Sequence, residues 1–285
     1  MSTVLAPAAV ARLRRLRLVT RRRVEGRYAG AHASRRHGTS LDFADYRAYV
    51  PGDDPRWVDA HAYARLGRLL TKRFEAEYET ALRVVVDTSA SMGFGGKAAA
   101  VRAVAAGLAA VALAGGDRVR VLLAGPEVDP GPWLRGARGL AQAQRRLAAV
   151  EIAGAADLAA ALRRARAEGP RGPVMLVSDL LFEGWEDVVT ELARGEATLV
   201  HLLGRTDVEP DVRGDLRLVD AETGAEVEVA VGERALADYA AARDAWLDAV
   251  RSAATRRGVV YARHLDDEPV EDLLAVRLTG LGVLA

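Results

Sequence analysis

The sequence predicts an α/β protein with a doubly wound, mostly parallel sheet and with extensions at its N-terminal and C-terminal ends. Two observations carry this prediction. From residue 81 to residue 204, short apolar runs alternate with stretches long enough for helices, which is the order of elements in a parallel sheet. These runs are apolar throughout rather than at every second residue, as expected of strands that helices cover on both faces.

We expect four strands in this region and one more near the C-terminus. The predicted strands are 82–86, 117–123, 173–177 and 197–203, with an edge strand at 259–261. The predicted helices between them are 97–114, 139–150, 157–168 and 185–194. The first helix has the length of a membrane span, but it is rich in Ala and Gly and contains Arg102, so we expect a buried helix of a soluble domain.

The regions on either side divide the chain into four segments. Residues 4–20 have helical apolar spacing, and seven arginines lie between Arg12 and Arg23, so residues 1–25 form a basic N-terminal helix. We expect it to dock on the core, and weak contact with an anionic membrane surface is the alternative. Residues 26–80 are expected to be ordered but irregular, ahead of the α/β domain at 81–204.

The last segment, residues 205–285, is predicted to pack on the core. Its runs at 216–220 and 226–231 flank a turn and predict a hairpin. A long helix is then expected over 234–257, where Gly258 would end it.

Composition excludes several classes of function. The 285 residues include no cysteine, which excludes disulfides, thiolate metal sites and cysteine nucleophiles. The 40 Lys and Arg against 39 Asp and Glu give a formal charge of +1, so nothing indicates nucleic acid as a partner. The N-terminus lacks the apolar stretch of a secretory signal, and we expect a cytoplasmic protein. The five histidines have no metal-ligand spacing. We expect His201 in a strand and the other four on the surface.

Polar side chains follow two of the predicted strands at the point where each strand ends. Asp87, Ser89 and Ser91 come at alternate positions after the first strand, and Asp179 follows the third. The carboxyl ends of parallel strands share one edge of the sheet, where α/β proteins bind ligands. Carboxylate and hydroxyl oxygens suit Mg²⁺, and Mn²⁺ or Ca²⁺ could replace it. Helix capping or turn closure by Asp87 and Ser89 is the alternative.

Four elements, taken in order, resemble the von Willebrand factor A domain with its metal-ion-dependent adhesion site. They are the Asp-x-Ser-x-Ser loop at 87–91, the Gly/Ala-rich helix after it, the Gly-Asp-Arg-Val sequence at 116–119 and the Ser-Asp turn at 178–179. The resemblance implies a Rossmann-like fold of that type. It also implies a divalent cation that binds a protein partner through an acidic side chain of the partner.

The preceding region resembles the bacterial domain of unknown function, family fifty-eight. The resemblance lies in a Tyr-x-Pro-Gly-Asp-Asp-x-Arg block at 49–56 and in the residues around it up to Glu79, and it extends over nearly the whole chain after about residue 24. It implies a role beside a MoxR-type AAA+ ATPase, as an adaptor or substrate-presenting partner. We expect the Asp53 and Asp54 turn itself to be a structural ion-pair turn.

One departure from the adhesion-site pattern concerns the cation. Where that pattern has a threonine, this chain has Ala156, so one hydroxyl ligand is missing. Asp157 follows directly and is therefore a candidate fifth ligand, with Asp87, Ser89, Ser91 and Asp179.

Three functions remain open at this point. The leading one is a non-enzymatic, divalent-cation-dependent protein-interaction module. The second is a metal-dependent nuclease or phosphatase that uses Asp87, Asp157 and Asp179 as a carboxylate cluster. The third is a metal-free scaffold that binds through the aromatic and charged residues of 42–79.

Overall fold

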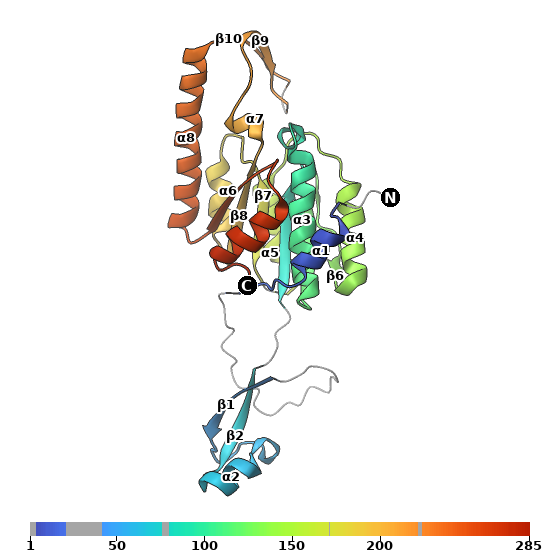
Figure 1. The fold of residues 1–285 in the computed structure, drawn as a ribbon, viewed down its shortest axis with the longest axis vertical. Coiled ribbons are helices and arrows are strands. Elements are labelled where there is room, and N and C mark those ends of the chain that lie inside the picture. The colour runs from blue at the N-terminus through green and yellow to red at the C-terminus, as the bar shows by residue number, and fades with distance from the viewer. Residues whose placement is uncertain (1–3, 21–41, 76–79, 171, 222–223) are drawn as a thin grey trace. The chain divides into compact units, whose positions relative to one another are not determined.

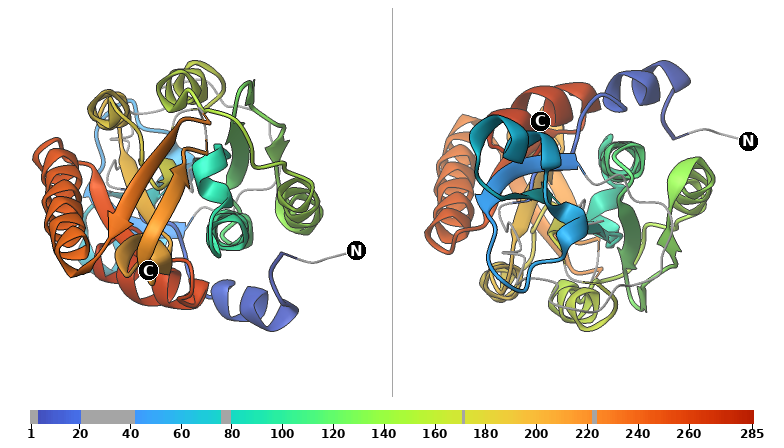
Figure 2. Two further views of the ribbon diagram at one scale, coloured as in Figure 1. Left: turned by 90° about the horizontal axis from the view of Figure 1, so that it is seen from above. Right: turned by 90° about the horizontal axis from the view of Figure 1, so that it is seen from below.

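The structure is a computed structural model that describes residues 4–20, 42–75, 80–170, 172–221 and 224–285, with the backbone alone for 42–45 and 73–75. The chain divides into two compact units, one formed by residues 1–23 and 80–285 and the other by residues 24–79. The first unit has an α/β fold with a mixed, mostly parallel central sheet and helices on both sides (Figures 1 and 2). The predicted α/β class and mostly parallel sheet are thus confirmed.

The sheet consists of parallel strands with a short antiparallel edge. Its order is β11-β8-β7-β3-β4-β5, and β6 pairs with β4 as well. The parallel strands are β3 (Ala81–Asp87), β4 (Arg118–Ala124), β7 (Val174–Ser178), β8 (Ala197–Leu203) and β11 (Val260–Leu265). The antiparallel pieces, which the sequence did not predict, are β5 (Val128–Asp129) and β6 (Trp133–Leu134). All five predicted strands are present.

Two apolar cores lie on the two faces of this sheet. In β3 the side chains of Leu82, Val84 and Val86 belong to one core and that of Val85 to the other, because successive residues of a strand point to opposite faces. The first core includes α1 (Pro7–Leu13), α3 (Lys97–Ala114), α4 (Gly136–Ala148) and the π-helix η3 (Asp272–Leu278). The second includes α5 (Leu158–Ala167), α6 (Trp185–Leu192) and α8 (Glu233–Arg256).

The helix α3 is long and apolar enough to cross a membrane by length and composition, and 72% of it is buried inside the protein. The predicted buried helix is therefore confirmed.

The N-terminal helix is shorter than predicted. The predicted helix over residues 4–20 is wrong in length, because α1 ends at Leu13. The chain then becomes extended and pairs with the C-terminus, where Arg17 and Ala285 exchange two backbone hydrogen bonds of 2.8 and 2.9 Å. Val10 and Leu13 of α1 are buried in the core, as expected for a docked helix.

The C-terminal segment contains the predicted hairpin and long helix. After β8 come α7 (Arg205–Val208) and the antiparallel pair β9 (Gly214–Val219) and β10 (Glu226–Val231). The first half of α8 is largely exposed, and its buried residues begin at Leu247. We call residues 205–246 the arm. Seen from above, its hairpin crosses the carboxyl edge of the sheet beside the short helix that follows β3 (Figure 2).

The second unit has more regular structure than the sequence predicted. It contains the antiparallel pair β1 (Asp42–Ala48) and β2 (Leu70–Glu75), the 3₁₀ helix η1 (Pro55–Trp57) and α2 (Ala60–Leu66). The expected ion-pair turn is present, since Asp53 pairs with Arg47 and Asp54 with Arg56. Asp59 caps α2 by accepting hydrogen bonds from the backbone N–H groups of residues 61 and 62.

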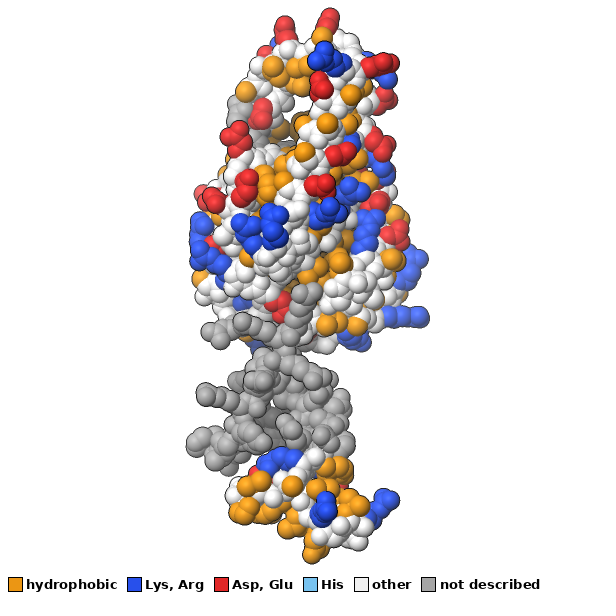
Figure 3. Space-filling model, turned by 90° about the vertical axis from the view of Figure 1, so that its left-hand side faces the viewer, with side chains coloured by type: hydrophobic (Ala, Val, Ile, Leu, Met, Phe, Trp, Pro, Cys, Tyr) orange, Lys and Arg blue, Asp and Glu red, His pale blue; other side chains and the backbone are white. Residues whose placement is uncertain are grey.

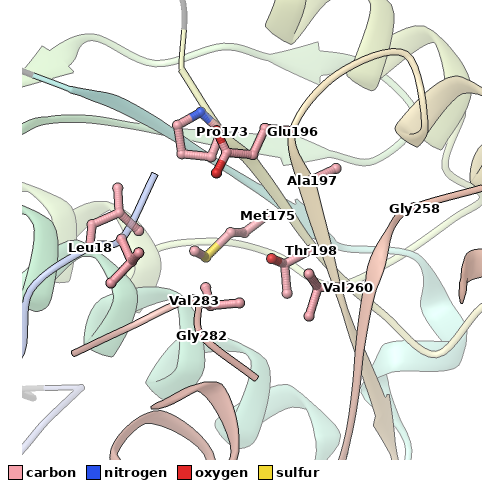
Figure 4. Close-up of a pocket in the computed structure, with 11 residues that line it drawn as sticks. Leu18, Pro173, Met175, Glu196, Ala197, Thr198, Gly258, Val260, Gly282 and Val283 are labelled. Atoms are coloured by element: carbon pink, nitrogen blue, oxygen red, sulfur yellow. The ribbon is translucent and has the colours of Figure 1, made fainter. Parts of the chain in front are cut away.

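A cavity of about 220 Å³ lies at the amino ends of the strands, opposite the edge where the predicted site lies (Figure 4). It is bordered by the first residues of β7, β8 and β11 and by Leu18 and Val283. Its lining is mostly apolar, and it holds none of the residues predicted to bind a cation.

Gly172 allows β7 to start close against β3. A Cβ atom there would lie 2.3 Å from the carbonyl oxygen of Ala81, which is backbone and cannot rotate away. We therefore predict that Gly172→Ala lowers the free energy of unfolding by about 1–3 kcal/mol. Chemical denaturation measures this, with Gly280→Ala as the matched control because a Cβ at Gly280 meets no atom within 4 Å. Equal stability of the two variants would contradict the prediction.

Candidate metal centre

The candidate site is built on the loop that leaves the buried strand β3. Asp87 ends this strand and is buried, and the next turn is the 3₁₀ helix η2 (Ala90–Gly93). The backbone N–H and the hydroxyl of Ser89 both donate to Asp87 Oδ1, at 2.9 and 2.7 Å. The hydroxyl oxygens of Ser89 and Ser91 are 3.1 Å apart. The three predicted ligands of this loop therefore lie together.

The neighbouring strand β7 brings the second carboxylate to the same place. Because β7 pairs in parallel with β3, the two strands end at the same edge. Ser178 Oγ donates to Asp87 Oδ2 at 2.6 Å, and Ser91 Oγ donates to Asp179 Oδ1 at 3.3 Å. Asp179 thus joins Asp87, Ser89 and Ser91, as the sequence predicted for adjacent strands.

The oxygen atoms of this group lie at hydrogen-bonding distances that are also compatible with a cation site. At ligand distances of about 2.0–2.1 Å, neighbouring ligands of an octahedral Mg²⁺ ion lie about 3 Å apart. The separations of 2.7 Å between Asp87 Oδ1 and Ser89 Oγ, 3.1 Å between the two serines and 3.3 Å from Ser91 to Asp179 are close to this value. The donors fit a hard divalent cation that keeps some of its water.

Asp157 lies in a turn next to this loop, and its carboxylate has a different contact. The backbone N–H of Ala90 donates to Gly154 O at 2.7 Å, so the turn borders the loop directly. The side chain of Asp157 is exposed and accepts from the N–H of Ala160 at 2.7 Å, which makes it the N-cap of α5. In the described part of the chain, no group of three or more His, Cys, Asp or Glu residues could hold a metal.

Lys97, the first residue of α3, is a part of the site that sequence reasoning missed. Its ammonium lies 2.8 Å from Asp179 Oδ2 and 2.9 Å from Asp207 Oδ2, and it is buried. Burial lowers the pKa of Lys97, but the charges of Asp179 and Asp207 outweigh this effect and raise it above its ordinary value. The sequence offered one signal for Lys97, the rarity of lysine, because only two of the 40 basic residues are lysines.

His201 supports the turn that carries Asp179. It lies in β8 as predicted, its Nε2 is 2.8 Å from the Asp179 carbonyl oxygen, and its Nδ1 is 2.9 Å from the Tyr261 hydroxyl. A carbonyl oxygen can only accept, so Nε2 carries the proton and Nδ1 accepts from Tyr261. Burial lowers the pKa of His201 to about 4, so the ring is neutral near pH 7. His264, expected on the surface, is also buried.

The backbone after Asp179 is strained. Leu180 has a φ of 52°, and it is the one non-glycine residue with positive φ among those described. The Leu180 N–H donates to Ser178 Oγ at 3.0 Å, and the side chain is buried. Such strain persists only where the surroundings fix the conformation, and it is concentrated at functional sites.

The electrostatics of the site are dominated by the buried carboxylate of Asp87. Burial first, and then the negative charge of Asp179, raise the pKa of Asp87 to about 6. Hydrogen bonds from Ser178 and Ser89 oppose this increase in part. The described contacts of Asp87 include no cationic side chain, and a divalent cation would supply positive charge there.

Fold and site together define an α/β protein with carboxylate and hydroxyl oxygens gathered at the carboxyl edge of its central sheet. The family described as "Protein of unknown function DUF58" matches residues 45–261, and the chain belongs to this family. Uncharacterized protein Rv1480 of Mycobacterium tuberculosis and Uncharacterized protein Mb1516 of Mycobacterium bovis are each 33% identical to it over 248 residues. These matches cover 83% of this chain and 78% of each relative. The predicted family is confirmed.

His201 predicts a loss of stability in acid. Its pKa is about 6.5 in the unfolded chain and about 4 in the folded one. The unfolded state therefore binds more protons as the pH falls from 6.5 towards 4, and stability decreases by up to about 1.4 kcal/mol per pH unit. We expect His201→Gln to flatten this slope in urea titrations between pH 7 and 4.5. Asp87, whose raised pKa gives the opposite slope, is present in both proteins and cancels. Parallel slopes would refute the assignment.

Proposed function

We propose that this chain is a non-enzymatic, divalent-cation-dependent protein-interaction module of the von Willebrand factor A type. One observation carries the proposal, which is the convergence of Asp87, Ser89, Ser91 and Asp179 at one edge of the sheet. These side chains supply only part of the shell of a Mg²⁺ ion, or of Mn²⁺ or Ca²⁺ in its place. A partner's carboxylate would complete that shell.

In this proposal the residues of the chain have separate roles. Asp87 supplies the buried negative charge, and the hydroxyls of Ser89 and Ser91 supply neutral oxygens. Asp179 faces the site with Oδ1, while its other oxygen is held by Lys97. When bound, the cation would attract the acidic side chain of the partner by its charge.

Exposed apolar side chains beside the site support a protein as the ligand. Phe94, the residue after η2, is 54% exposed, and Leu181, two residues after Asp179, is 43% exposed. The Leu181 N–H donates to Asp179 Oδ1, so this residue borders the carboxylate directly. Large apolar side chains next to a polar anchor are typical of protein interfaces.

The arm adds a second exposed surface at the same edge. Leu218 of β9 is paired with Val227 of β10, and these side chains are 47% and 54% exposed. Residues 205–246 include 11 acidic and 5 basic residues, and acidic side chains are spread over this end of the unit (Figure 3). A partner with basic side chains around its acidic anchor would therefore be favoured.

We propose a MoxR-type AAA+ ATPase as a working partner, with the chain as its adaptor in the cytoplasm. This part of the proposal is supported by membership of the DUF58 family and by the resemblance of residues 81–204 to the von Willebrand factor A domain. The net charge of +1 gives no reason to include nucleic acid. Arginines of the Arg12–Arg23 stretch could add weak contact with an anionic membrane surface.

The alternatives differ in which residues they require. A nuclease or phosphatase would need Asp157 beside Asp87 and Asp179, whereas Asp157 caps α5. A metal-free scaffold would bind its partner equally well in EDTA. The Asp157 contact ranks the nuclease or phosphatase below the cation-dependent module, and partner binding in EDTA distinguishes the scaffold from it.

The first test compares two aspartates. We expect Asp87→Asn to abolish Mg²⁺ and Mn²⁺ binding in calorimetry, because it removes the charge at the centre of the site. Asp157→Asn should leave both the affinity and the free energy of unfolding nearly unchanged, since Asn caps a helix about as well as Asp. Loss of binding in Asp157→Asn would make this residue a ligand, and binding that survives in Asp87→Asn would refute the site.

The second test restores the missing hydroxyl. We expect Ala156→Thr to increase the affinity for Mg²⁺ by about tenfold, equivalent to ~1.4 kcal/mol, because it adds an oxygen to the turn that borders the loop. Ala156→Val is the control, since it has the same shape without the hydroxyl. The prediction fails if calorimetry finds the same affinity in both variants.

A further inference from the structure

Lys97 lies between the candidate metal centre and the arm. Its ammonium contacts Asp179 Oδ2 on one side and Asp207 Oδ2 on the other, at 2.8 and 2.9 Å. Asp179 belongs to the turn after β7, whereas Asp207 belongs to α7 at the base of the arm. A single buried cation therefore joins two parts of the chain that are 28 residues apart in sequence and have different roles in the proposed function.

The choice of lysine at this position is informative. The chain has 38 arginines and only two lysines, and both lysines pair with a buried aspartate. Lys72 contacts Asp59 at 3.1 Å, and Lys97 contacts Asp179. An ammonium is a compact charge on a flexible stem and can shift between partners, whereas a guanidinium forms a planar fork with fixed geometry. The position of Lys97 suits a cation that changes partners.

From Asp207 the contacts continue into the arm. The same Oδ2 atom accepts from the Gly204 N–H at 2.8 Å and so caps α7. The carbonyl oxygen of Asp207 accepts from the Tyr239 hydroxyl at 2.5 Å, and Arg243 donates to the carbonyl oxygen of Val208. Both of these donors lie on α8. Asp207 therefore connects Lys97 to the place where α7 and α8 meet.

Occupation of the metal centre would change these contacts. A divalent cation near Ser91 would use Asp179 Oδ1, while Lys97 holds Oδ2 of the same carboxylate. Two positive charges on one carboxylate repel each other, and the buried setting screens this repulsion poorly. Lys97 can reduce it by moving towards Asp207, which already lies within contact distance.

We infer that Lys97 couples cation binding to the base of the arm, by releasing Asp179 and pairing with Asp207 alone when the cation binds. This inference rests on the proposed function and adds its regulation. Asp207, through Lys97, then sets the affinity of a cation that it does not itself bind. Coupling of this kind is reciprocal, so a partner that holds the arm in the shifted state strengthens cation binding by the same factor.

A double-mutant cycle on the full chain tests the inference, with Mg²⁺ and Mn²⁺ as the probes in calorimetry. The variants are Lys97→Gln, Asp207→Asn and the combination of the two. Asp267→Asn is the matched control, because Asp267 pairs with Arg205 of α7 at 2.9 Å without contact to Lys97. Asp207 is partly exposed, so Asp207→Asn provides a readout even if Lys97→Gln folds poorly.

We expect Asp207→Asn to weaken cation binding by about 5-fold or more when Lys97 is present. In the Lys97→Gln background the same change should have less than about half of that effect, because no ammonium remains to be relocated. Equal effects in both backgrounds would mean that Asp207 acts through space, and would overturn the inference. An effect of Asp267→Asn as large as that of Asp207→Asn would also overturn it.

Hydrogen exchange gives a second readout. Mg²⁺ should slow amide exchange over residues 204–208 in the wild type, because Lys97 then pairs with Asp207 alone, and should not do so in Lys97→Gln. If the wild type binds the cation without slower exchange over residues 204–208, the inferred coupling is refuted and the proposed function is unaffected. Binding in Lys97→Gln but not in the wild type supports competition by Lys97 and refutes cation dependence of the natural protein. Failure of every variant to bind overturns both.

Discussion

Parallel pairing of β3 with β7 is the constraint on which the candidate site depends. The register places Val86 opposite Val177, so both strands reach the carboxyl edge together and their next residues share one space. Asp87 and Asp179 could otherwise be far apart, since they are separated by more than 90 residues in sequence. The apolar cores on both faces hold this register, because a shift by one residue would turn buried side chains to the wrong face.

The charges at this edge are unequal. Asp179 and Asp207 share one ammonium, that of Lys97, whereas the described contacts of Asp87 are with Ser89 and Ser178. The surplus of negative charge in a buried place is costly, and the chain responds in part by hydrogen bonds from Ser89 and Ser178. Protonation of Asp87, whose pKa is raised to about 6, would reduce this surplus by one charge, and binding of a divalent cation would neutralise it. The same surplus thus explains the affinity we propose and its connection to the arm.

Sequence reasoning succeeded where local patterns decide the structure. The apolar runs of β7 and β8 and the helix α3 were predicted almost to the residue, because burial on both sides leaves a continuous apolar signal. Sequence reasoning failed where contacts with distant segments decide the local structure. The basic segment after Leu13 becomes extended because Ala285 pairs with Arg17, and no signal in residues 14–20 indicates that partner. The pair β1 and β2 is likewise formed by segments that are joined through a turn and a short helix.

The sequence by itself determined which polar side chains follow the strands, since Asp87, Ser89, Ser91 and Asp179 could be named from their positions after apolar runs. Only the tertiary structure decided which of the candidates meet. It brought these four together, and it placed Asp157 at the N-terminus of α5, where its carboxylate caps the helix. It also added Lys97 and His201, which lie in a helix and a strand with no motif around them. The physical reason is that contact across strands depends on sheet order and register, which arise from the packing of the whole unit rather than from neighbouring residues.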